Sequence, residues 1–173
     1  LAWRVIMEIS NIFVGENVII DETSSVNNVK IGNNVKISKY CSVYGSKRNI
    51  LVIGDNSYIG MFTIINGYSD LITIGNNVSI AQNVNIMADS GPNASPSLQR
   101  VFEIVHGSVT IEEGCWIGAG AIIMPNVHIG KYSVVGANCF LDRSFDEFSI
   151  IGGTPARLIR RMSEDEINLI LEK

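Results

Sequence analysis

Large aliphatic residues recur at every sixth position along much of this chain. The longest uninterrupted run comprises Ile111, Ile117, Ile123, Ile129, Val135 and Leu141. Four further sets of three keep the same spacing: Val14, Ile20 and Val26; Ile31, Ile37 and Val43; Ile53, Ile59 and Ile65; and Ile74, Ile80 and Ile86. A period of six fits neither the turn of a helix, about 3.6 residues, nor the alternation of a hairpin strand, about two. The pattern therefore predicts a parallel β-solenoid built from hexapeptide steps.

The positions between the large aliphatics describe a short strand followed by a sharp bend. A small or β-branched residue usually stands four positions after the aliphatic, as at Val35, Cys41 and Ser57. Gly, Asn and Asp gather at the bends, as in IGNN at 31–34 and 74–77, where left-handed dihedrals are needed. Three steps close a triangle, and coils of about eighteen residues stack about 4.8 Å apart. The sequence thus predicts an all-β prism of about six coils.

The C-terminal segment has a different pattern. Ser163 and Glu166 have the spacing of a helix capping box, and apolar residues follow them. We expect residues 1–162 to form the solenoid domain, with a long loop inserted at about 87–110. Residues 163–173 are expected to form a short α-helix that caps the exposed last coil.

Three interruptions of the six-residue spacing all follow the third strand of a predicted coil. The extra residues lie at 45–48, at 66–69 and at about 87–110. Because each follows the same strand, the three segments should leave the same corner and stack along one edge of the prism. Loops on a rigid scaffold often carry function, so we interpret this edge as a binding site. An edge that serves only assembly is the alternative.

Composition agrees with one compact domain and argues against two classes of partner. Of the 173 residues, 46% are hydrophobic, and 16 glycines accompany only 4 prolines. The net charge of −4 argues against a nucleic-acid partner, and no apolar stretch reaches the length of a membrane span. Cys41, Cys115 and Cys139 occupy the small inward position, which indicates buried structural thiols rather than metal or redox groups.

Basic residues gather near the C-terminal end of this acidic chain. The group consists of Lys131, Arg143, Arg157, Arg160 and Arg161. Charge alone leaves two interpretations open, a solvated face or a rim that binds phosphate, a group that Arg recognises well.

Two stretches carry a family resemblance. The sequences IEEGCWIGAGAIIMPNVHIGKYSVVGANCFLD at 111–142 and SIIGGTPARLIRRM at 149–162 resemble the closing coils of hexapeptide-repeat acyltransferases. The sugar and serine O-acetyltransferases and the xenobiotic acetyltransferases are the most similar branches. The resemblance implies a left-handed β-helix, against the usual right-handed crossover. It also implies a cytoplasmic homotrimer that binds acetyl-CoA in a cleft between subunits, with no metal.

The resemblance also indicates which residues would hold the cofactor. The positions that match the family's cofactor site are Ala119, Ala137, Asp142, Arg143, Gly153, Pro155 and Arg160. Backbone groups at Ala119 and Ala137 would meet the pantetheine arm, where small side chains permit close approach. Arg160 would reach a CoA phosphate. Asp142 and Arg143 stand where the family commonly has a Thr-Lys pair, so one hydroxyl contact is absent.

The family's catalytic base is a histidine at the start of the long loop, and this chain lacks it. The stretch reads NIMADSGPNAS at 85–95, and the family's position falls on Asp89, Ser90 or Gly91. His106 ends the same loop, and the two ends of a loop leave and rejoin the prism at nearly the same corner. His106 is therefore a candidate for a relocated base, and a loop histidine without a catalytic role is the alternative. Asp89 is the second candidate, since a carboxylate can also accept the proton.

These features predict an enzyme that moves an acetyl group from acetyl-CoA to a hydroxyl or amine of a sugar or polysaccharide precursor. Asn66, Tyr68, Asp89 and Ser90 are expected to contact the acceptor, because they lie on two neighbouring insertions. The alternative is a catalytically silent homologue that binds CoA or a glycan or acts as a scaffold, because the loop histidine is absent. A zinc-dependent solenoid enzyme needs several imidazole ligands, which two histidines at unrelated spacing do not supply, and no metal is expected.

Overall fold

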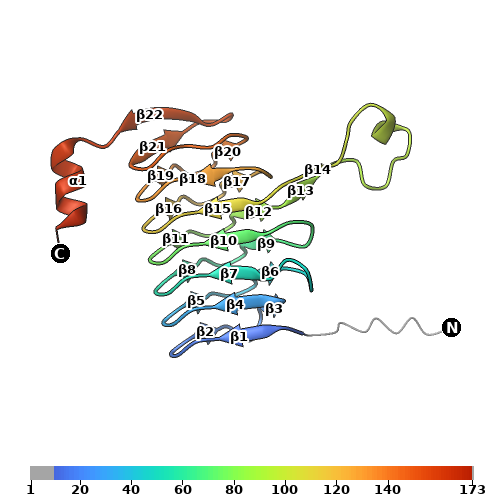
Figure 1. The fold of residues 1–173 in the computed structure, drawn as a ribbon, viewed down its shortest axis with the longest axis horizontal. Coiled ribbons are helices and arrows are strands. Elements are labelled where there is room, and N and C mark those ends of the chain that lie inside the picture. Colours follow the sequence, from blue (N-terminus) through green and yellow to red (C-terminus); the bar gives the residue numbers. More distant parts are fainter. Residues whose placement is uncertain (1–9, 173) are drawn as a thin grey trace.

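The computed structural model describes residues 10–172, which form a parallel β-solenoid with one short C-terminal helix (Figure 1). Each coil contributes one strand to each of three parallel sheets, which form the three faces of a prism. The first and third faces have six strands, so the solenoid has six coils. The fold class predicted from the six-residue spacing is confirmed.

The strands follow one another around the prism in a fixed order. The first face comprises β1 (Ile12–Val14), β4 (Val29–Ile31), β7 (Leu51–Ile53), β10 (Ile72–Ile74), β15 (Val109–Ile111) and β18 (His128–Ile129). The second comprises β2 (Ile19–Ile20), β5 (Lys36–Ile37), β8 (Tyr58–Ile59), β11 (Ser79–Ile80), β16 (Trp116–Ile117), β19 (Val134–Val135), β21 (Ser149–Gly152) and β22 (Arg157–Arg161). The third comprises β3 (Ser25–Asn27), β6 (Ser42–Tyr44), β9 (Ile64–Asn66), β12 (Asn85–Met87), β17 (Ile122–Ile123) and β20 (Phe140–Leu141).

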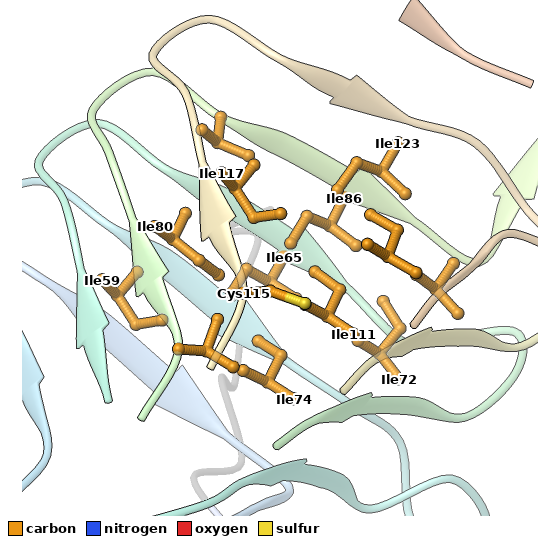
Figure 2. Packing of buried hydrophobic residues seen from close by; sticks show 14 of the residues in the cluster. Ile59, Ile65, Ile72, Ile74, Ile80, Ile86, Ile111, Cys115, Ile117 and Ile123 are labelled. Carbon is orange, nitrogen blue, oxygen red and sulfur yellow. The ribbon is translucent and has the colours of Figure 1, made fainter. Parts of the chain in front are cut away.

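The predicted aliphatic positions build the core. On the second face Ile80 pairs in register with Ile59 on one side and with Ile117 on the other. The first face has the same arrangement, where Ile74 pairs with Ile53 and Ile111. These side chains are at most 1% exposed, and Figure 2 shows that the three faces turn them toward one another. From the second coil onward, the six-residue step thus places each of these aliphatic side chains at the same depth as its counterpart one coil away.

The small inward positions carry polar groups that hydrogen-bond to a neighbouring coil. Ser57 Oγ donates to the carbonyl of Gly75 at 3.0 Å, and Thr63 Oγ1 donates to Ala81 at 3.1 Å. The three cysteines are also buried and unpaired. Within residues 10–172, no buried side-chain nitrogen or oxygen lacks a hydrogen-bond partner, which keeps the cost of burying these groups low.

Asparagine occupies many of the sharp corners, as predicted for the bends between strands. Asn34, Asn56 and Asn77 have φ values of 55°, 57° and 56°, in the left-handed region that Asn tolerates better than most residues. Their side chains also stack from coil to coil, since Asn34 Nδ2 donates to Asn56 Oδ1 at 3.0 Å. The corners therefore add a polar ladder outside the apolar core.

The C-terminal helix α1 (Glu164–Leu171) begins at the predicted capping box. Ser163 Oγ accepts from the backbone N–H of Glu166, and the Glu166 carboxylate accepts from the N–H of Ser163 at 2.8 Å. The Arg160 guanidinium donates to both oxygens of the same carboxylate, at 2.7 and 2.8 Å. None of the helices in the described part of the chain has the length and apolar character needed to cross a bilayer.

The predicted position of this helix across the last coil is wrong. α1 buries none of its residues, and Leu169 is 72% exposed. Figure 1 shows the helix beside the prism rather than over its end. The exposed edge of the second face is covered instead by β22, which turns back and pairs antiparallel with β21.

Removing one member of the core ladder should destabilise the fold. Ile80 is fully buried, so we expect Ile80→Ala to lower the free energy of unfolding by about 2–5 kcal/mol through lost burial and the cavity that remains. The neighbouring exposed Ser79 supplies the control, and Ser79→Ala should change the free energy by less than about 0.5 kcal/mol. Urea titration followed by circular dichroism measures both. Equal losses for the two variants would contradict the ladder.

The ion pair between Arg160 and Glu166 should be detectable as a lowered pKa of the Glu166 carboxyl group. The Arg160 hydrogen bonds, with those from Ser163, lower the pKa of Glu166 from 4.5 to about 2. Since the folded-state pKa is the lower one, this pair supports α1 above pH 4.5 and loses its effect as the pH falls toward 2. Carboxyl-carbon NMR should show Glu166 titrating near pH 2, and at a higher pH in Arg160→Gln, where only the Ser163 hydrogen bonds still lower its pKa. Arg157→Gln is the control and should leave this titration unchanged.

Candidate functional site

The three insertions leave the prism at one edge, as predicted. Each follows a strand of the third face, after β6, β9 and β12, and these three strands pair side by side. The longest insertion forms a two-stranded ribbon of β13 (Asp89–Ser90) and β14 (Val105–His106), with the short 3-10 helix η1 (Leu98–Arg100) at its far end. Figure 1 shows this ribbon projecting on the side opposite α1.

Hydrogen bonds join the insertions around the carboxylate of Asp89. Asn66 Nδ2 donates to Asp89 Oδ1 at 3.3 Å, and Ser69 Oγ donates to Asp89 Oδ2 at 2.8 Å. Asn66 Oδ1 accepts from the N–H of Tyr68 at 3.1 Å, and the carbonyl of Tyr68 accepts from Asn49 Nδ2 at 3.2 Å. Asp89 is therefore held in place by the second insertion, which is itself tied to the first.

His106 lies beside Asp89. The two are register partners in the antiparallel ribbon, so their side chains leave the same face of it. The N–H of Gly107 donates to the carbonyl of Ala88 at 3.0 Å, which closes the base of the loop. The returning loop thus brings His106 close to Asp89, one of the three positions on which the family histidine could fall. Its catalytic role stays a prediction.

A hollow of about 720 Å³ opens at this edge, and all three insertions line it. Its wall is formed by residues 46–49, Tyr68, Ser69 and His106, with Ser10 and Asn28. A second hollow of about 310 Å³ also touches Asn28 and Tyr68, so the two adjoin. Tyr68 is 66% exposed between them. Of the other acceptor candidates, Asn66, Asp89 and Ser90 line neither hollow, and Asp89 meets the larger one only through its hydrogen bond with Ser69.

The structure adds residues that the sequence had not indicated as ligands. Tyr44 lines the smaller hollow, and burial, with a lesser effect of the Asp89 charge, raises the pKa of its phenol. Lys47, Arg48 and Asn49 line the larger hollow from the first insertion. Their position at the first interruption of the repeat is the sequence feature that could have identified them as lining residues. For Tyr44 that feature is its register with Asn66 of the second interruption.

The cofactor candidates lie at other parts of the prism. Ala119 and Ala137 lie in the bends after β16 and β19, between the second and third faces. Asp142 and Arg143 bond to each other at 2.9 Å. The turn before β22 contains Gly153, with φ of 98°, and Pro155, and Arg160 is bound to Glu166. The structure thus brings Asn66, Tyr68 and Asp89 together and places Ala119 and Ala137 on another edge, whereas Asp142 and Arg143 follow β20 of the third face and lie on the edge of the insertions.

Thiol chemistry has no support at this site. All three cysteines are buried in the prism, and burial raises the pKa of Cys115 to about 11, so it is a poor source of thiolate at neutral pH. Within residues 10–172, the structure contains no group of three or more His, Cys, Asp or Glu side chains arranged to hold a metal ion.

Comparisons with known proteins agree with this architecture. Residues 108–143 match the family model described as bacterial transferase hexapeptide (six repeats). Galactoside O-acetyltransferase of Escherichia coli strain K12 is 33% identical over 123 residues, which cover 70% of this chain and 59% of the relative. Chloramphenicol acetyltransferase of Escherichia coli is 31% identical over 121 residues, 68% of this chain and 58% of the relative. The chain thus spans less than two thirds of these relatives' lengths.

Solved structures extend the similarity over almost the whole chain. AntD, an N-acyltransferase from Bacillus cereus, was crystallised as a mutant with dTDP-4-amino-4,6-dideoxyglucose and coenzyme A. It is 29% identical, with a TM-score of 0.77 over 92% of this chain and 88% of that one. The polySia-specific acetyltransferase NeuO is 22% identical, with a TM-score of 0.63, and shares the fold. The repeat, the fold and these matches together show that residues 108–143 carry the hexapeptide repeat of bacterial transferases and that the prism as a whole is similar to acyltransferases built from this repeat.

Proposed function

We propose that this protein transfers an acetyl group from acetyl-CoA to a hydroxyl or amine of a sugar or polysaccharide precursor. The observation that carries the proposal is the pair of Asp89 and His106, placed side by side where three insertions enclose a hollow. Relatives named as sugar or drug acetyltransferases, and AntD with its amino-sugar nucleotide and coenzyme A, support it. The free, buried cysteines suit a reducing compartment, and we place the protein in the cytoplasm.

On this proposal His106 is the general base. Its imidazole takes the proton from the acceptor hydroxyl or amine as that group attacks the thioester carbonyl, because imidazole titrates near neutral pH. The carbon–sulfur bond of the thioester then breaks, and CoA leaves as the thiol after gaining a proton. Asp89, fixed by Asn66 and Ser69, accepts a hydrogen bond from the acceptor and orients it. Asp89 is also the alternative base.

Acetyl-CoA would lie along the edge between the second and third faces. The small side chains of Ala119 and Ala137 leave the backbone there open to the pantetheine arm. Arg143 and Arg160 are the candidates for the CoA phosphates, and the turn at Gly153 and Pro155 shapes the end of the groove. To bind a CoA phosphate, Arg160 would have to release Glu166 or bind both groups at once. Arg143 would have to do the same with Asp142.

The separation of the two sets of residues favours a catalytic unit made of more than one chain. Ala119 and Ala137 follow strands of the second face, whereas the insertions follow strands of the third face. Ala119 and Ala137 therefore lie on a different edge of the prism from the insertions. Asp142 and Arg143 follow β20 of the third face and share the edge of the insertions. A neighbouring copy would bring its cofactor edge against the acceptor edge of this one, as in the homotrimer that the family resemblance implies.

Acetyl-CoA turnover tests the function directly. Release of CoA thiol, followed with a thiol reagent against a panel of sugars, amino sugars and their activated forms, should show acceptor-dependent activity. His106→Ala should lower kcat roughly 10²–10⁴-fold while binding of acetyl-CoA by calorimetry is unchanged. His128→Ala is the control, since this exposed histidine bonds to Glu112 on the first face.

Two results would change the assignment. Loss of activity in Asp89→Asn, with His106→Ala still active, would make the carboxylate the base. CoA binding without turnover of any acceptor would favour the silent homologue.

The assembly has its own test. Size-exclusion chromatography with light scattering should give about three times the 18.9 kDa chain mass, because Ala119 and Ala137 lie on a different edge from the acceptor residues within one chain. A monomer at micromolar concentration that still turns over acetyl-CoA would show that one chain holds the whole site. Mixing Ala137→Trp and His106→Ala chains supplies a further check. If the site is shared, mixed oligomers should recover activity that neither variant has alone.

A further inference from the structure

The backbone of His106 is held by a residue outside the long loop. Asn126 Nδ2 donates to the carbonyl of His106 at 3.2 Å, although 20 positions separate the two in sequence. Within residues 10–172, no hydrogen bond or ion pair joins the His106 imidazole to another residue. The position of this imidazole therefore depends on how its backbone is fixed.

Asn126 lies in the turn that follows the third face one coil after the long loop. The turn connects β17 to β18, so it shares the edge of the three insertions. Because β18 pairs with β15, with His128 in register with Thr110, this turn stacks on the residues that lead the loop back into β15. Asn126 has a φ of 67°, in the left-handed region that Asn tolerates. Its amide bonds to the returning loop.

Gly107 leaves the space that the Asn126 amide occupies. A Cβ at position 107 would lie 2.0 Å from Asn126 Oδ1 and 2.5 Å from its Nδ2. The N–H of Gly107 donates to the carbonyl of Ala88 at 3.0 Å, at the start of the same loop. The pair of residues His106 and Gly107 is thus bonded to the coil before the loop and to the coil after it.

The turn that carries Asn126 is fixed in its own right. Ser144 Oγ donates to the carbonyl of Asn126 at 3.4 Å and accepts from the N–H of His128 at 2.9 Å. Bonds to its backbone from one coil and from its side chain to another fix the direction of the Asn126 amide. Support of this kind holds a functional side chain in a productive position.

We infer that Asn126 is a positioning residue for His106. The amide fixes the backbone of His106 so that the imidazole stays beside Asp89, and Gly107 provides the room for this contact. The inference rests on the proposed function, in which His106 is the general base. Asn126 acts only through His106, because a base must lie within hydrogen-bond reach of the acceptor and a small displacement slows proton transfer.

Two variants remove the contact in different ways. Asn126→Gly deletes the amide and places at this corner a residue that accepts the left-handed conformation. Gly107→Ala keeps the amide but displaces it, since the new methyl group would take its place. Each should lower kcat about ten- to a hundredfold and leave the KM of acetyl-CoA unchanged. Asn56→Gly is the matched control, an exposed left-handed asparagine bonded to Asn34 at another corner, and should leave kcat unchanged.

A double-mutant cycle separates positioning of the base from a general structural effect. In the His106→Ala background, Asn126→Gly should change kcat by less than about twofold, because the residue that it positions is gone. An equal loss in both backgrounds would show a structural role and overturn the inference. Unchanged kcat in both Asn126→Gly and Gly107→Ala would overturn it as well.

Amide hydrogen exchange of the intact protein supplies a readout that does not need activity. The N–H of Gly107 should exchange about fivefold faster in Asn126→Gly than in the wild-type protein or in Asn56→Gly, since one of the two bonds that fix this segment is lost. Unchanged exchange would overturn the inference. If the wild-type protein acetylates no acceptor, the proposed function fails, whereas faster exchange at Gly107 would still support Asn126 as the residue that fixes His106.

Discussion

The register between successive coils is the constraint on which the rest of this structure depends. Ile59, Ile80 and Ile117 stack in line because each coil returns to the same point after three six-residue steps. A one-residue slip within a strand would turn its large aliphatic to solvent and its polar neighbour inward. Extra residues are tolerated where the chain turns between strands, because the next strand can restart at its proper depth.

This constraint explains the placement of the chemistry. All three insertions lie between the third face of one coil and the first face of the next, so their strands β6, β9 and β12 remain in register. Stacking then makes neighbours of residues that are distant in sequence, and Asn66 meets Asp89 because one coil separates them. The rigid prism fixes the base of each insertion, and hydrogen bonds between insertions fix their tips. A site with several ligands is built in this way without any change in the core.

The sequence predicts what the repeat determines, and little beyond it. The ladder, the asparagine corners and the shared edge all follow from spacing, since strand depth is a local property of a six-residue step. The position of α1 does not follow from spacing, because an apolar face shows that a helix needs a partner but not which surface supplies it. In the described residues that face stays exposed. Arg160 was assigned to a phosphate from its place in the family pattern, and its bond to Glu166 became visible only in three dimensions.

The site shows the same division between local and long-range information. Loop closure made the approach of His106 to Asp89 predictable, since both residues lie where the loop meets the prism. The donors on Asp89 were not predictable, because Asn66 and Ser69 belong to a different insertion and their rotamers depend on packing. Arg48 was hidden for another reason: a single basic residue in a loop has no distinguishing pattern. Only the folded chain shows that three loops place it in the wall of one hollow. Lys47 and Arg48 both lie on the first insertion, and the stacking of the coils places them in one wall with His106 of the third.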